Sequence, residues 1–242
     1  MADVAWALSG DDASDARTES YAGAVAELYA ARSRPVDMVG GPLEALRAAS
    51  ELPSVRAVVL PVGPDPPRDT WPPARTCAKP VVLLGRRVPE KAVRMAVGLV
   101  PLDGVSATSE ALATVLRHLR GGGMRLHALH VFDPDHVPAF WDPAHTQDAW
   151  ATEFLRRHLE EAVEIDIRRG IPSQEVYDAT ESGLFDLLVV AWRGTIAAGR
   201  GDVVRRCVMD GCVPVMLVPT GTDLPGPSAL VRGMDVDREL LS

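Results

Sequence analysis

Residues 186–219 read DLLVVAWRGTIAAGRGDVVRRCVMDGCVPVMLVP, and this stretch decides the fold. It opens with a nearly continuous apolar run from Asp186 to Ala191, which is typical of a strand buried on both faces of a parallel sheet. After a glycine-containing loop, a helix is predicted from Asp202 to Met209. The run from Val213 to Val218 predicts a closing strand, with Pro214 near its start, where a missing N–H is tolerated. A strand, a helix and a strand in this order indicate an α/β fold.

The same alternation of strands and helices extends upstream to residue 94. Strands are predicted from Met95 to Val100, from Arg125 to Phe132 and from Val163 to Ile167. Helices are predicted from Thr108 to Leu119 and from about Thr146, because apolar residues recur there at helical spacing. We therefore expect residues 91–220 to form an open parallel five-stranded sheet with helices on both faces.

Residues 1–90 resemble a shortened copy of this unit. Three pairs of segments correspond: Val36 to Pro42 with Ile165 to Pro172, Ala57 to Pro61 with Leu187 to Ala191, and Cys77 to Leu84 with Cys212 to Val218. One strand-helix pair is missing, most simply the equivalent of the strand from Arg125 to Phe132. Chance similarity between valine-rich strands is the alternative explanation.

If the two copies pack as a pseudo-dimer, their last strands meet. Val81 to Leu84 is then predicted to lie antiparallel beside Val215 to Val218. Residues 221–242 are rich in Gly, Pro and Asp, so this tail is expected to be partly mobile.

The composition limits the classes of partner. The 242 residues carry a net charge of −8, which disfavours wide contact with nucleic acid. No apolar run approaches the roughly 18 residues that a membrane span needs. The N-terminal segment turns acidic and has no basic flank, so a cytoplasmic location is expected. Cys77, Cys207 and Cys212 form no metal or disulfide pattern, and they are expected to be small buried apolar residues.

Four short motifs, in this order and spacing, resemble the universal stress protein family. They are PLDG at 101–104, HVFD at 130–133, the turn from Arg169 to Pro172, and CVPVMLVP at 212–219. The resemblance covers residues 94–219 and, more loosely, 1–86. It implies the strand order 3-2-1-4-5, tandem copies or dimers joined through the last strand, and a role in the stress response by association with another protein.

Nucleotide-binding members of the family resemble one another in a G-x2-G-x9-G-[ST] loop after strand four. Its backbone N–H groups and the following helix start hold the phosphates. Adenine is held near an aspartate that ends strand one and a valine that ends strand two. By this resemblance, Pro101, Asp103 and Val131 match the adenine side of such a site.

The phosphate side departs from the family pattern. Gly194 and Gly201 take the second and third glycine positions, but Ala191 replaces the first and Asp202 replaces the Ser or Thr. Six residues separate Gly194 from Gly201, which is three fewer than the motif has. The Asp202 carboxylate would compete with phosphate for the free N–H groups of the helix start and would repel it. Basic side chains of the loop could offset some of this repulsion.

We therefore expect a degenerate nucleotide site and no cofactor, with Asp103 as a plain turn residue. The alternative is a sensor that binds ATP or another adenine ligand through a rearranged loop containing Gly194, Arg200 and Gly201. A hydrolase or adenylyl-transfer enzyme is a third candidate, but no nucleophile with a supporting base is found, so no catalytic residue is predicted.

The other polar and aromatic clusters indicate ordinary structural roles. Five residues between the second strand and the next helix match no established ligand spacing, so no metal site is expected: Asp133, Asp135, His136, Asp142 and His145. His127 and His130, three apart on one strand, are predicted to face opposite sides of the sheet. Trp192 is predicted to border the crevice at the carboxyl ends of strands one and four, where such folds place a ligand.

Overall fold

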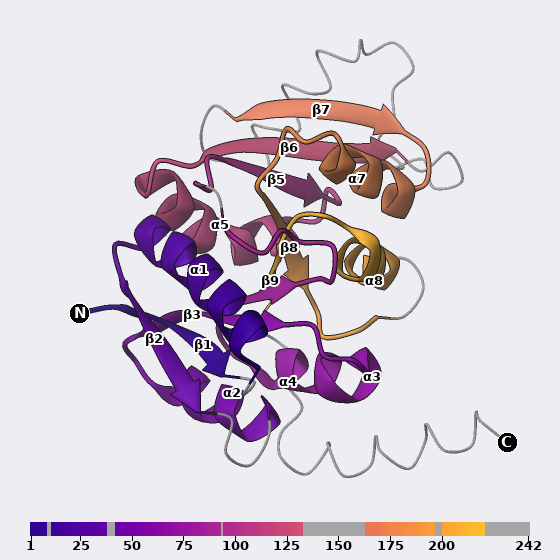
Figure 1. Cartoon of the computed structure of the whole chain (residues 1–242). Coiled ribbons are helices and arrows are strands. Elements are labelled where there is room, and N and C mark those ends of the chain that lie inside the picture. The colour runs from indigo at the N-terminus through magenta and orange to yellow at the C-terminus, as the bar shows by residue number, and fades with distance from the viewer. Residues whose placement is uncertain (9–10, 38–41, 93, 133–162, 197–199, 221–242) are drawn as a thin grey trace, which may run out of the picture.

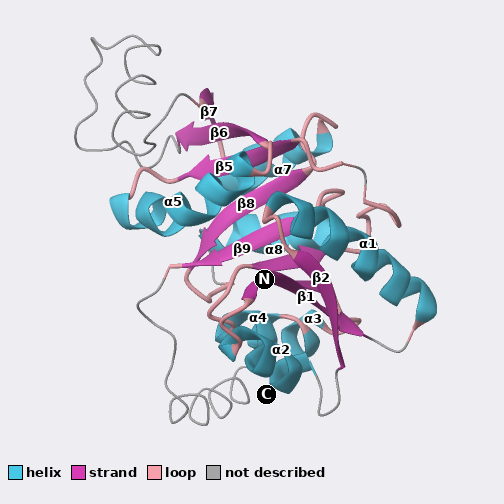
Figure 2. Ribbon diagram, turned by 90° about the vertical axis from the view of Figure 1, so that its left-hand side faces the viewer, coloured by secondary structure: helices cyan, strands magenta, loops and turns pink. Residues whose placement is uncertain are grey.

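The computed structural model describes residues 1–8, 11–37, 42–92, 94–132, 163–196 and 200–220. These residues form one nine-stranded sheet in the order β2-β1-β3-β4-β9-β8-β5-β6-β7. Helices cover both faces of the sheet (Figures 1 and 2). The α/β class predicted from the sequence is confirmed.

The second half of the chain contributes five parallel strands in the order β7-β6-β5-β8-β9. They are β5 (Val97–Leu102), β6 (Arg125–Phe132), β7 (Glu164–Arg169), β8 (Leu187–Trp192) and β9 (Val215–Pro219). The helices are α5 (Ser106–Gly121), α7 (Pro172–Glu181) and α8 (Arg200–Asp210). This is the order 3-2-1-4-5, and each predicted boundary within the described residues lies within two residues of the observed one.

The first half contributes four parallel strands in the order β2-β1-β3-β4. They are β1 (Asp3–Leu8), β2 (Arg32–Asp37), β3 (Val55–Pro61) and β4 (Val81–Leu84). The helices are α1 (Asp12–Leu28), α2 (Pro42–Glu51), α3 (Pro66–Asp69) and α4 (Trp71–Thr76). The sequence predicts that the first half lacks the equivalent of β6, which is the strand that lies beside the first strand, β5, in the second half. In the structure β2 fills that position, so this half is shorter at its outer edge.

The two half-sheets are joined by β4 and β9, which pair antiparallel. Val81, Val82 and Leu83 lie opposite Leu217, Met216 and Val215, respectively. The predicted antiparallel contact between these two strands is confirmed. It makes the nine strands one continuous sheet instead of two separate ones.

The core has one layer on each face of the sheet, and each layer runs through both halves. On one face, Val82 and Met216 pack with residues of α1 and α5. On the other face, Leu83 and Leu217 pack with residues of α2, α4, α7 and α8. Side chains alternate along β4 and β9, so these two strands supply apolar residues to both layers.

The cysteines lie partly as expected. Cys77 and Cys207 are buried, and desolvation raises the pKa of these thiols to about 11 and about 12. Cys212 is only partly buried. None of the helices that the structure describes is long and apolar enough to cross a lipid bilayer. The helix expected from Thr146, the aromatic loop before it and the tail 221–242 lie outside the described residues.

Candidate functional site

The predicted site residues lie at the same end of neighbouring strands. β5 pairs in parallel with β6 on one side and with β8 on the other, so the carboxyl ends of these three strands lie together. Pro101 and Asp103 lie at the end of β5, and Val131 lies near the end of β6. Gly194 follows β8, and Gly201 lies in the first turn of α8. Arg200 is the first residue of α8; its side chain lies outside the described part of the structure.

The Asp103 carboxylate stabilises the turn from β5 into α5. One oxygen accepts the N–H of Val105 at 2.9 Å, and the other accepts the hydroxyl of Thr108 at 3.0 Å. Gly104 adopts a φ of 76°, a backbone conformation that favours glycine. Asp103 therefore makes the contacts of a turn residue, as the Asp-Gly pair predicts.

His130 is a residue at this end of the strands that the sequence analysis did not select. Its imidazole is buried, and Nδ1 lies 2.8 Å from the carbonyl oxygen of Leu102, the residue before Asp103. The ring also meets Phe132 edge to face, with centroids 4.7 Å apart. His127 lies on the opposite face, beside Glu164, as the odd spacing predicts. His130 thus fixes the end of β5 from the neighbouring strand.

The loop after β8 begins with a tight turn. The Trp192 indole N–H donates to the carbonyl of Thr195 at 2.9 Å, and Gly194 between them has a φ of 79°. Trp192 is buried in the core layer on the α8 side. Its indole therefore braces the turn from within the core and does not form an open wall of a crevice.

Gly201 is held against the backbone of the same loop. A Cβ at this position would lie 2.5 Å from the carbonyl carbon of Ile196 and 2.7 Å from its Cα. Real Cβ atoms do not come so close, and a backbone neighbour cannot rotate away. Glycine is therefore required at residue 201 for the loop to pack onto the first turn of α8.

Gly194 is contacted by the first half of the chain. A Cβ on Gly194 would lie 3.0 Å from Cγ and 3.7 Å from Cδ of Arg75, a residue of α4. The alkyl part of the Arg75 side chain therefore lies across the turn after β8. Sequence analysis missed this residue because no local pattern reports a contact between distant segments.

Asp202, which replaces the family's Ser or Thr, pairs with a side chain of its own helix. Its carboxylate accepts a hydrogen bond from Arg205 at 3.1 Å, one turn further along α8. Arg206 lies over the ring of Tyr177, 4.8 Å from its centroid. Arg205 and Arg206 are thus both engaged within the fold.

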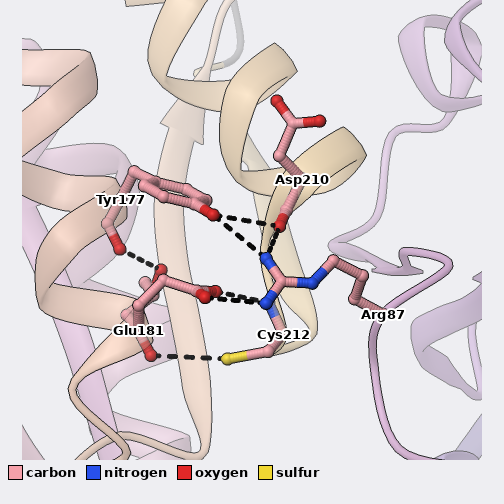
Figure 3. Close-up of polar contacts among 6 residues, drawn as sticks. Arg87, Tyr177, Glu181, Asp210 and Cys212 are labelled. Carbon is pink, nitrogen blue, oxygen red and sulfur yellow. Dashed lines mark hydrogen bonds and ion pairs between the residues drawn. The ribbon is translucent and has the colours of Figure 1, made fainter.

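The far end of α8 is tied down by a second group of polar residues, here called the Arg87 cluster: Arg87, Tyr177, Glu181, Asp210 and Cys212 (Figure 3). The Arg87 guanidinium donates to Glu181 at 2.9 Å, to the hydroxyl of Tyr177 at 3.0 Å and to the carbonyl of Asp210. The Cys212 N–H donates to the other Glu181 oxygen at 3.2 Å. The cluster therefore joins the segment after β4 to α7 and to the C-terminal end of α8.

The charges of this cluster stabilise each other. Desolvation acts to raise the pKa of Glu181, but the hydrogen bonds from Cys212 and Arg87 outweigh it, and the pKa lies below its ordinary value of 4.5. The hydrogen bond to Glu181 raises the pKa of Arg87. Within the described residues, no three His, Cys, Asp or Glu side chains come together to hold a metal ion.

Comparison with known proteins identifies the family. The model of the universal stress protein family matches residues 99–219, which is half of the chain. The chain therefore belongs to the universal stress protein family. A sequence comparison with curated proteins gives no significant match.

Solved structures share the fold. A universal stress protein from Archaeoglobus fulgidus aligns at 16% identity with a TM-score of 0.50, covering 78% of this chain and 66% of that one. The chain thus spans about two thirds of that protein. A functionally unknown protein from Pseudomonas aeruginosa PAO1 aligns at 12% identity with a TM-score of 0.52, covering 90% and 81%. A putative universal stress protein from P. aeruginosa UCBPP-PA14 aligns at 11% with the same TM-score, covering 90% and 82%.

Proposed function

We propose that this chain is a non-catalytic universal stress protein that acts by association with another protein, and that its nucleotide site is degenerate. The family supplies the stress-response class. The degenerate site and the mode of action are our proposals, and they rest on the geometry at the carboxyl ends of β5, β6 and β8.

One observation carries the proposal: the loop after β8 packs on the first turn of α8. The main chain of Ile196 fills the space beside Gly201 that a Cβ would need. Polyphosphate recognition by such a loop requires backbone N–H groups that converge on an open space. The loop is three residues shorter than the family motif, the main chain of Ile196 already lies against Gly201, and the Asp202 carboxylate at the helix start adds repulsion.

The test is calorimetric titration of the purified chain with ATP, together with mass spectrometry of small molecules released from it. We expect no released nucleotide and no binding of ATP at micromolar concentration. Micromolar binding that is lost in an Asp103→Ala variant would overturn the proposal. Nucleotide turnover above that of a heat-killed control would show an enzyme.

The rival function is an adenine-nucleotide sensor. One observation favours it: Pro101, Asp103, Val131, Gly194 and Gly201 all lie at the same end of neighbouring strands. This function requires the loop to open away from Gly201 when nucleotide binds. The same titration decides between the two.

We also propose that residues 1–90 and 91–220 are tandem copies, the first of them truncated. Two observations support this. The strand orders β2-β1-β3-β4 and β6-β5-β8-β9 are equivalent, and the last strands of the two halves, β4 and β9, pair antiparallel, as in a two-fold arrangement. The first copy would then act as a built-in partner on the edge of β9.

A further inference from the structure

Arg75 places a positive charge from the first half of the chain beside the candidate site of the second half. Its Cγ and Cδ lie on Gly194, and its Nε would be 4.0 Å from a Cβ there. Arg193, the residue before Gly194, is exposed, and so is Arg75. Two arginines from different halves thus flank one turn.

Neither guanidinium forms a hydrogen bond or an ion pair within the part of the chain that the structure describes. They differ from Arg87, Arg205 and Arg206, whose guanidinium groups are engaged within the fold. Arg205 pairs with Asp202, Arg206 lies over Tyr177, and Arg87 is held by Glu181 and its neighbours. As far as the described residues go, the donors of Arg75 and Arg193 are available for an outside group.

The acidic residue in the first turn of α8 is Asp202. The Asp202 carboxylate pairs with Arg205 of its own helix at 3.1 Å. Two exposed arginines thus lie at the turn of Gly194, although the whole chain carries a net charge of −8. Two positive side chains on a chain of negative net charge favour a partner group of negative charge at this turn.

We propose that Arg75 and Arg193 together bind carboxylate side chains of an acidic segment of a partner protein. The segment would lie across the seam between the two halves, which is the place where β4 pairs with β9. This inference rests on the proposed function, and it specifies the chemistry of the partner. Guanidinium groups bind carboxylates with paired N–H donors, and such contacts need no deep pocket. A polyphosphate needs backbone N–H groups that converge on an open space, and the main chain of Ile196 already fills the space beside Gly201.

Both halves of the chain would contribute a residue to this site. α4 reaches the turn because β4 and β9 join the half-sheets, so the second half alone would present only Arg193. The acidic partner would then recognise the intact chain and not either half. This would make the first half a component of the site.

The test uses a fluorescein-labelled hexaglutamate peptide and fluorescence polarisation at about 10 mM salt, where screening is weak. The full chain is compared with Arg75→Met, Arg193→Met and a control, Arg56→Met. Methionine removes the charge but keeps an apolar side chain of similar reach. Arg56 is also exposed and, like Arg75, belongs to the first half of the chain. It lies near the start of β3, whereas Arg75 lies in α4, beyond the end of that strand. We expect Arg75→Met and Arg193→Met each to weaken binding about threefold to tenfold, and Arg56→Met to leave it unchanged.

The net negative charge of the chain makes nonspecific attraction of this peptide unfavourable, which sharpens the test. Absence of peptide binding, or equal weakening in all three variants, would overturn the inference and leave the proposed function standing. If ATP binds and Arg75→Met weakens that binding, the anion is a nucleotide phosphate, and both the proposed function and the acidic partner are wrong. Thermal midpoints within about 2 °C of the unmodified chain show that each variant is folded.

Discussion

Gly201 shows how a single residue of a family motif can be retained for packing. The backbone of Ile196 fills the space that any side chain would need. We predict that Gly201→Ala lowers the free energy of unfolding by about 1–3 kcal/mol, the usual cost of overpacking, as measured by urea denaturation. Gly23 in α1 is the matched control, because a Cβ there meets nothing within 4 Å. Gly23→Ala should stabilise the chain by about 0.5–1 kcal/mol. Equal effects of the two substitutions would contradict the packing argument.

Gly194 and Arg75 should be coupled energetically. Gly194→Ala is expected to cost about 1–2 kcal/mol because of its positive φ, plus the cost of displacing the Arg75 side chain. In an Arg75→Ala background only the backbone cost remains. The double-mutant cycle should therefore give an interaction free energy of about 0.5–1 kcal/mol, as measured by denaturant unfolding. Additive effects would mean that Arg75 does not lie against the turn in solution.

At the scale of elements, the sequence predicts features that depend on neighbouring residues, and it misses features that depend on contacts between distant segments. The strand boundaries follow from apolar runs and turn residues, so β5 to β9 were found to within two residues. The role of Asp103 follows from the Asp-Gly pair. The position of β2 beside β1 did not follow, because strand order depends on packing between distant segments. The contact of Arg75 with Gly194 was missed for the same reason.

The Arg87 cluster fixes the C-terminal end of α8, so its charges should affect stability in a pH-dependent way. The pKa of Glu181 is lowered in the folded chain, so its stabilising effect is present above the ordinary value of 4.5 and is lost as pH falls below it. We predict that Glu181→Gln lowers the thermal midpoint by about 1–3 °C at pH 7, and that the difference shrinks as the pH falls below 4.5.

Scanning calorimetry of both proteins across this pH range measures the effect. Glu51→Gln is the control, because the ion pair of Glu51 with Arg47 is about two-thirds exposed on both sides. Its effect at pH 7 should be smaller. A Glu181→Gln difference that stays constant from pH 7 to pH 3 would show that the carboxylate charge does not act through this cluster.

At the scale of the whole molecule, the antiparallel pairing of β4 and β9 makes two sequence halves one physical unit. Both core layers cross this pairing, so the two halves share two continuous apolar layers. The segment after β4 adds polar contacts with both halves: the Gly85 carbonyl accepts from Arg17 of α1, and Arg87 reaches α7 and α8. A chain built in this way should unfold without a stable intermediate in which only one half is folded.

Leu83 tests this cooperativity, because it is fully buried at the seam and lies opposite Val215. Removing its side chain leaves a cavity that touches both halves, so Leu83→Ala should cost about 2–5 kcal/mol of unfolding free energy. Calorimetry should nevertheless show a single transition, with equal calorimetric and van't Hoff enthalpies. Leu52→Ala, at a residue that is 41% exposed, should change stability little. Two separate transitions in Leu83→Ala would mean that each half is stable alone, because only then could weakening the seam uncouple them.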